Sequence, residues 1–200
     1  MRARALVWQR EDAAGAETAL VTFERGRITA VGTAIGSEPV PYRLLYTVET
    51  EGDYRTTRCT ATAEGLGFRR IIELERHPDG GWTCEAETHG ERDLPPAGAD
   101  VTTLEGALDV DLGYSPLTNT PPILRAGLLD DGPSVDVDAA WISVPALSVE
   151  RLEQRYSFVR RHGDGAVVRY ATRSGSFVAD LTCDRDGFVE RYPGLASLAS

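Results

Sequence analysis

The 200-residue chain contains no lysine, and all 21 of its basic residues are arginine. Enzymes that form a Schiff base, use a lysine general base or bind nucleotide phosphates through a P-loop lysine require the missing side chain. The sequence also has no glycine-rich phosphate loop and no G-x-S-x-G nucleophile motif. These absences exclude several enzyme classes and favour a protein that is not an enzyme.

Cysteine and histidine are scarce and poorly spaced for metal binding. The three cysteines form no C-x-x-C pair, and the three histidines lie beside turns without an H-x-H or H-E-x-x-H spacing. They are Cys59, Cys84, Cys183, His77, His89 and His162. We therefore expect buried free thiols, no disulfide, no metal and no cofactor.

Long apolar runs are missing as well. No stretch of about 18 apolar residues could span a bilayer, and the N-terminal sequence MRARALVWQRED lacks the apolar region of a signal peptide. These features predict a cytoplasmic protein without membrane insertion. A hydrophobic content of 42% is enough for a sizeable core and predicts one domain over residues 1–200.

Positive charge is in deficit. The formal net charge is −10 and the pI is near 4.8, whereas phosphate binding requires a clustered basic face. Nucleic acid is therefore not an expected partner.

Short alternating or apolar runs, separated by turn residues, fill most of the chain. Roughly a dozen such runs at intervals of about 8 to 12 residues are typical of an all-β protein, mainly antiparallel and with little helix. The expected strands are residues 4–9, 17–24, 27–35, 40–49, 54–63, 67–75, 82–87, 101–112, 135–141, 148–160, 165–173, 176–183 and 188–192. Residues 90–100 are expected to form a surface loop, residues 118–124 a helical turn, and residues 196–200 a frayed tail. The periodicity alone does not decide whether these strands form a barrel, a sandwich or a roll.

Residues 109–125, DVDLGYSPLTNTPPILR, combine three signals. Strand alternation places Asp109 and Asp111 on one face, with Cβ atoms about 6 to 7 Å apart. Glycine and prolines then predict a stiff loop that carries Thr118, Asn119 and Thr120. Arg125 closes the segment with a cation.

This segment allows several kinds of chemistry. Two carboxylates on one face could serve a carboxylate-dependent hydrolase, or Asp109 and Asp111 could pair with Arg125 and accept loop hydrogen bonds. The side chains of Thr118, Asn119 and Thr120 could bind sugar hydroxyls or cap a helical turn.

Aromatic residues are spread over many strands. They include Trp8, Tyr42, Tyr46, Tyr54, Trp82, Trp141, Tyr156, Phe158 and Tyr170. Such residues usually fill a core, but on the concave face of a curved sheet they can also line an apolar cavity. The sequence does not distinguish a filled interior from a hollow one.

The order of motifs resembles a bacterial family usually called putative glycolipid-binding proteins. The resemblance rests on D-x-D-L, T-N-T-x-P-I and Arg125 in the central segment, on Y-R-T-T-R at residues 54–58, on Q-R-Y at residues 154–156, and on D-G-F-V at residues 186–189. It implies a spiral β-roll, an open and strongly curved sheet similar to a barrel. The sequence P-P-I-L-R-A from Pro121 replaces the family's more usual L-P-I-R-R, so one arginine of the family pattern is missing.

The resemblance also implies a function. It predicts a non-enzymatic protein that binds an amphipathic small molecule, a glycolipid or lipid-like metabolite, in an apolar cavity of the roll. The residues expected to bind the ligand are Asp109, Asp111, Thr118, Asn119, Thr120, Arg125, Gln154 and Tyr156. The alternatives are a hydrolase that uses Asp109 and Asp111, and a structural or interaction module without a ligand. The exposed edges of an open roll could pair with a second copy of the chain, so a homodimer is a further possibility.

Overall fold

The computed structural model describes residues 1–90 and 93–199, and these residues form one sheet of 14 strands with four short helical segments. The strands are β1 Arg2–Arg10, β2 Gly15–Glu24, β3 Arg27–Gly36, β4 Tyr42–Glu51, β5 Arg55–Gly65, β6 Phe68–Arg76, β7 Trp82–Gly90, β8 Asp109–Leu112, β9 Val135–Ile142, β10 Val149–His162, β11 Gly165–Thr172, β12 Val178–Cys183, β13 Val189–Tyr192 and β14 Ala196–Leu198. The helical segments are α1 Thr120–Arg125 and the 3-10 helices η1 Val101–Leu104, η2 Pro116–Asn119 and η3 Leu128–Asp130. The prediction of an all-β, mainly antiparallel fold with little helix is confirmed.

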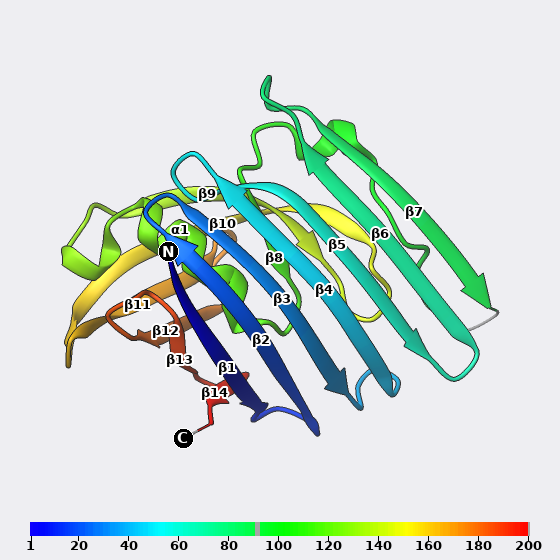
Figure 1. The fold of residues 1–200 in the computed structure, drawn as a ribbon, viewed down its shortest axis with the longest axis horizontal. Helices are drawn as coiled ribbons and strands as arrows, with labels where there is room; N and C mark the ends of the chain where they lie inside the picture. The colour runs from blue at the N-terminus through cyan, green and yellow to red at the C-terminus, as the bar shows by residue number, and fades with distance from the viewer. Residues whose placement is uncertain (91–92, 200) are drawn as a thin grey trace.

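The sheet is strongly curved and open (Figure 1). Its strand order is β7-β6-β5-β4-β3-β2-β1-β14-β13-β12-β11-β10-β9-β8, so the last strand, β14, joins the two halves by pairing with β1. In Figure 1, β1 to β7 form a sloping front layer, and β9 to β11 cross behind it. All strand pairs are antiparallel except β8 with β9, because the chain between them crosses over through η2, α1 and η3. The prediction of an open, curved, barrel-like roll is confirmed.

One end of the sheet is wrapped inside the roll. The backbone N–H of Thr56 on β5 donates to the carbonyl of Leu108 over 2.9 Å, and the Thr56 hydroxyl accepts from the N–H of Val110 over 3.1 Å. The indole of Trp82 on β7 donates to the carbonyl of Ala107 over 3.1 Å. The edge strand β8 therefore finds hydrogen-bond partners on the inner face of the opposite layer, and it carries Asp109 into the interior.

Two strand glycines of the front layer are covered by tyrosine rings from the neighbouring strand. Gly32 and Gly36 on β3 lie directly opposite Tyr46 and Tyr42 on β4. A Cβ at Gly32 would lie 2.0 Å from Cζ of Tyr46, and one at Gly36 would lie 2.5 Å from Cε1 of Tyr42. The tyrosine rings thus cover bare backbone, an arrangement in which the ring replaces the packing that glycine lacks.

We expect Gly32→Ala to lower the free energy of unfolding by about 1–3 kcal/mol, because the added methyl group displaces the Tyr46 ring and breaks its hydrogen bond to Glu17. Urea unfolding followed by fluorescence measures the change. The exposed Val31 on the same strand provides the control, since Val31→Thr should stay within about 0.5 kcal/mol of wild type. Equal urea midpoints for Gly32→Ala and wild type would contradict the prediction.

The interior contains two groups of buried apolar side chains. The larger group lies between the inner face of β1 to β7 and residues 104–117, and includes Trp8, Ile72 and Leu112. The smaller group lies around β10 to β13 and α1, and includes Ile123 and Tyr156. Between the two groups the chain of residues 115–123 is buried throughout. Among the residues that the structure describes, no helix is long and apolar enough to cross a membrane.

Most expected strands are present, but the predicted strand over residues 101–112 is wrong at its start. Val101–Leu104 form η1, because the Asp100 carboxylate accepts hydrogen bonds from the N–H and hydroxyl of Thr102 and caps the helix. The expected helical turn at residues 118–124 is confirmed as parts of η2 and α1, in which Pro121 and Pro122 occupy the first turn, where no backbone N–H is needed.

The predicted frayed tail is also wrong over Ala196–Leu198. These residues form β14, in which Leu198 pairs with Trp8 and Ala196 pairs with Arg10, so the backbone hydrogen bonds of β1 hold them in place. Ser200 lies outside the described residues. The expected loop over residues 90–100 is partly outside them as well, at residues 91 and 92. In its described part, Gly98 forms an isolated parallel bridge with Ser148.

Candidate functional site

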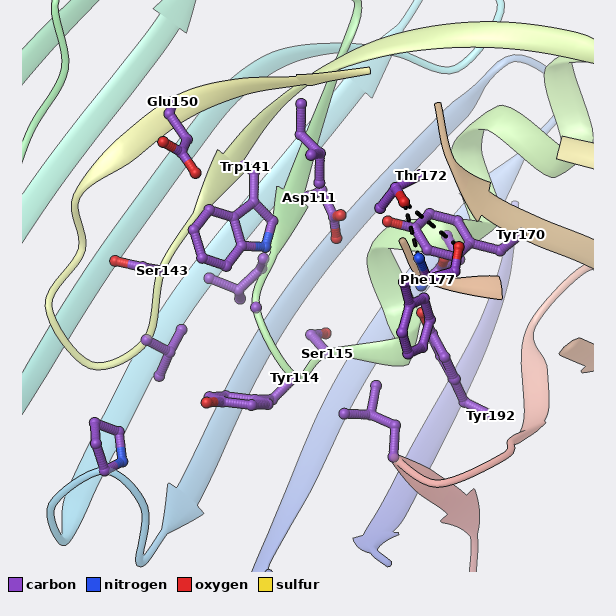
Figure 2. A pocket seen from close by; sticks show the side chains of 17 residues that line it. Asp111, Tyr114, Ser115, Trp141, Ser143, Glu150, Tyr170, Thr172, Phe177 and Tyr192 are labelled. Carbon is purple, nitrogen blue, oxygen red and sulfur yellow. Dashed lines mark hydrogen bonds between the residues drawn. The ribbon is translucent and has the colours of Figure 1, made fainter. Parts of the chain in front are cut away.

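A pocket of about 570 Å³ opens between residues 111–119 and the curved strands β9 to β13 (Figure 2). Its aromatic wall consists of Tyr114, Trp141, Tyr170, Phe177 and Tyr192, and its aliphatic wall includes Leu112, Val144, Leu152 and Leu195. Polar side chains are fewer, and Asp111, Ser115, Asn119 and Glu150 are among them. The pocket volume lies within the range of small-molecule sites, which are typically apolar with a few placed polar groups.

The three rings on one side of the pocket pack against one another. The ring of Phe177 lies 5.9 Å from that of Tyr170 and 6.2 Å from that of Tyr192, measured between centroids, and Tyr170 and Tyr192 are 6.2 Å apart. Phe177 precedes β12 and is 44% exposed, whereas both tyrosines are buried. Trp141 faces this cluster from the other side of the pocket in Figure 2. The arrangement leaves room for an apolar group between aromatic faces.

Asp111 on β8 directs its carboxylate into the space between Trp141 and the aromatic cluster (Figure 2). Gln154 donates to Oδ2 over 2.6 Å, and the hydroxyl of Thr118 donates to Oδ1 over 3.3 Å. Burial raises the pKa of Asp111 to about 6, although both hydrogen bonds act in the opposite direction. A carboxylate can accept about four hydrogen bonds, so this one retains acceptor capacity toward the pocket.

A hydrogen-bonded chain holds Asp111 and Asn119 from behind. The buried hydroxyl of Tyr156 lies 3.0 Å from Oδ1 of Asn119 and 3.2 Å from Oε1 of Gln154, so the phenol links the two amides. Gln154 then donates to Asp111, as described above. Gln154 is thus hydrogen-bonded through both its amide nitrogen and its amide oxygen, and Asn119 through its amide oxygen. These bonds hold the side chains of Asp111 and Asn119 in position at the pocket.

Asp109 and Arg125 form a separate, buried ion pair. The guanidinium NH1 of Arg125 lies 2.8 Å from Oδ1 of Asp109, and NH2 contacts Oδ2, so the contact is bidentate. Their side chains are 2% and 12% exposed, respectively. Neither residue lines the pocket. The carboxylates of Asp109 and Asp111 are therefore not a free pair, and the hypothesis of a hydrolase that uses both gains no support from this geometry.

The eight residues predicted to bind ligand thus fall into three sets. Asp111 and Asn119 line the pocket. Thr118, Gln154 and Tyr156 contact those two side chains from behind. Asp109 and Arg125 pair with each other, and the fully buried Thr120 has a hydroxyl without a hydrogen-bond partner in the structure.

Several pocket residues were not predicted as site residues. Trp141 and Tyr170 were among the aromatic residues that could either fill a core or line a cavity, and Tyr114, Phe177 and Tyr192 were not assigned to a cavity. Tyr114 has a left-handed backbone with φ of 67°, which is uncommon outside glycine and asparagine. The guanidinium of Arg10 lies 4.0 Å above its ring centroid. This cation–π contact positions the ring at the pocket rim, and nothing in the local sequence indicated it.

Ser115 connects the pocket to a buried glutamate, Glu17, which no motif in the sequence indicated. Its hydroxyl donates to Oε1 of Glu17 on β2 over 2.6 Å, and the hydroxyl of Tyr46 contacts the same oxygen. Burial is the main cause that raises the pKa of Glu17 to about 7. Oε2 of Glu17 is buried without a partner. Among residues 1–90 and 93–199, no group of three or more His, Cys, Asp or Glu side chains converges as a metal site would require.

Comparisons with known proteins agree with this architecture. The crystal structure of a DUF1089 family protein from Pseudomonas aeruginosa, determined at 1.80 Å resolution, is similar with a TM-score of 0.70 and 28% sequence identity over 94% of each chain. No curated protein matches the sequence. A family model described as "Putative glycolipid-binding" matches residues 5–197, which include every strand from β2 to β13 and the whole pocket. The chain therefore belongs to the putative glycolipid-binding family.

Proposed function

We propose that the protein binds an amphipathic small molecule, a glycolipid or a lipid-like metabolite, and performs no chemistry on it. The apolar part of the ligand would lie against the aromatic and aliphatic walls of the pocket, and the polar head would reach Asp111 and Asn119. The observation that carries this proposal is the pocket of about 570 Å³, which has aromatic walls and a hydrogen-bonded carboxylate in its lining.

The hydrogen bonds around the pocket favour binding over catalysis. Thr118 and Tyr156 direct their hydroxyls to side chains of the protein, and Arg125 is bound to Asp109. Thr118 and Tyr156 therefore hold Asp111 and Asn119 in position, which is the role of supporting groups in a binding site. The family description supports the ligand class, and the pocket supports its amphipathic character.

We expect Trp141→Ala to weaken binding of a fluorescent fatty-acyl probe about tenfold, because burying an aromatic side chain against the acyl chain contributes on the order of 1.5 kcal/mol. Fluorescence titration of the purified protein measures the affinity. Leu20→Ala is the matched control, since Leu20 is exposed on β2 and does not line the pocket.

Native mass spectrometry of protein purified from its own host, followed by denaturing extraction, would identify the bound molecule. A co-purifying glycolipid or lipid that Trp141→Ala loses while staying folded supports the proposal. Protein that carries no lipid and takes up no acyl probe would reject it.

A further inference from the structure

Asp109 and Asp111 occupy the same strand, two residues apart, but only one of them has a cationic partner. Asp109 binds Arg125 through both oxygens. Asp111 accepts hydrogen bonds from the neutral side chains of Gln154 and Thr118, and among the described residues no arginine or histidine forms an ion pair with it. A half-buried carboxylate without a counter-ion costs free energy when it ionises. It is therefore a site where a ligand can supply the missing positive charge.

Aromatic rings surround this carboxylate on the pocket side. Tyr170 and Tyr192 line the same pocket as Asp111 and lie beside its carboxylate in Figure 2. Trp141 lies on the other side of the carboxylate in Figure 2. The faces of aromatic rings attract cations by about 0.5 to 2 kcal/mol each, more when water is excluded. Rings together with a carboxylate form a site that favours an ammonium group.

The remaining charge of the pocket has the same sign. Glu150 is the other ionisable acid that lines it, and no arginine or histidine is among its lining residues. A phosphate, sulfate or carboxylate head group would be repelled by Asp111 and would find no basic side chain in the lining. A neutral sugar could donate a hydroxyl to Asp111 but could not balance its charge.

We propose that the head group of the ligand carries a protonated amine, which pairs with Asp111 inside the aromatic pocket. The inference rests on the proposed amphiphile binding and specifies the class of head group. Two sources share this chemistry, an alkylamine and an amino sugar on a lipid chain. In both, the ammonium N–H groups donate to the acceptor positions that Gln154 and Thr118 leave open on Asp111.

Four probes with the same twelve-carbon chain test the proposal below their critical micelle concentrations. They are dodecylamine, its uncharged analogue N-dodecylacetamide, dodecyl β-glucoside and dodecyl 2-amino-2-deoxy-β-glucoside. Isothermal titration calorimetry at pH 7.5 and physiological salt gives the affinity of each. We expect dodecylamine to bind at least tenfold more tightly than N-dodecylacetamide, and the aminoglucoside at least tenfold more tightly than the glucoside. The larger of the two amine affinities distinguishes an amino sugar from a plain amine.

Asp111→Asn should remove these preferences, so that each amine binds no more tightly than its uncharged counterpart. Glu190→Gln is the matched control, because it removes one negative charge at an exposed position on β13 outside the pocket and should leave every preference unchanged. A general attraction of cations to the acidic protein would instead lower amine affinity equally in both variants.

The outcomes separate the two proposals. If the uncharged probes bind as tightly as the amines to wild type, the ammonium inference is overturned and amphiphile binding stands. If none of the four probes binds, amphiphile binding fails as well. The comparison of charged and uncharged probes on wild type decides the inference even if Asp111→Asn does not fold.

Discussion

Replacing Arg125 with methionine is expected to lower the free energy of unfolding by about 3–5 kcal/mol, the usual cost of leaving one member of a buried ion pair alone. Asp109 is 1% exposed, and both of its oxygens contact the Arg125 guanidinium. Methionine preserves much of the side-chain volume but offers no hydrogen bond. The carboxylate then has to ionise without a partner or take up a proton.

Urea unfolding of single and double variants measures this cost and isolates its origin. The double variant Arg125→Met with Asp109→Leu removes both charges, so it should recover most of the stability that the single change loses. Because neither residue lines the pocket, the double variant should also keep its affinity for the acyl probe. A loss below about 1 kcal/mol for Arg125→Met, or a double variant as unstable as the single one, would contradict this account of the pair.

The strands could be predicted from the sequence because most of them follow a two-residue period with one face buried. On β2, for example, Ala19, Val21 and Phe23 are buried and alternate with exposed residues. Residues 101–108 have apolar positions too, but Leu104 and Ala107 are buried by a capped 3-10 helix and the turn after it. Hydrophobicity alone does not separate these two ways of burying a side chain. For this reason the predicted strand began too early, at residue 101 instead of residue 109.

The polar residues of the candidate site could be named from the sequence, whereas the sequence left open whether the aromatic residues fill a core or line a cavity. Asp111 and Asn119 belong to one short segment, and the turn and the 3-10 helix η2 that connect them keep them close. Tyr170, Phe177 and Tyr192 come from β11, from the turn before β12 and from β13. Their meeting depends on the register and curvature of three strands, and a strand side chain on the concave face can pack into a core or line a cavity with the same periodicity.

The stability of the protein should decrease as the pH rises from 5 to 8, mainly because of Glu17. The pKa of this glutamate is raised from 4.5 to about 7 by burial, and that of Asp111 is raised from 3.8 to about 6 for the same main reason. The folded protein therefore binds protons more tightly than the unfolded chain at both positions. Protonation stabilises the fold fully below the unfolded pKa, and this contribution is lost as the pH rises through the folded pKa.

Over this interval we expect a loss of roughly 2 kcal/mol from Glu17 and about 1 kcal/mol from Asp111, at 1.36 kcal/mol for each unit of pKa shift. Asp12 and Asp180, whose pKa values are lowered chiefly by hydrogen bonds from Arg10 and Arg169, act in the opposite direction only below about pH 4. They therefore do not mask the trend between pH 5 and 8.

Glu17→Gln tests the origin of this pH dependence. Glutamine keeps an oxygen that can accept from Ser115 and Tyr46, as Oε1 of Glu17 does, but it cannot ionise. Urea unfolding at pH 5, 6, 7 and 8 should show a flatter profile for this variant and a higher stability than wild type at pH 8. Asp111→Asn should remove only the smaller change between pH 5 and 6. Parallel profiles for Glu17→Gln and wild type would mean that Glu17 is already ionised across this range, and that the hydroxyls of Ser115 and Tyr46 are sufficient to hold a buried carboxylate beside the pocket.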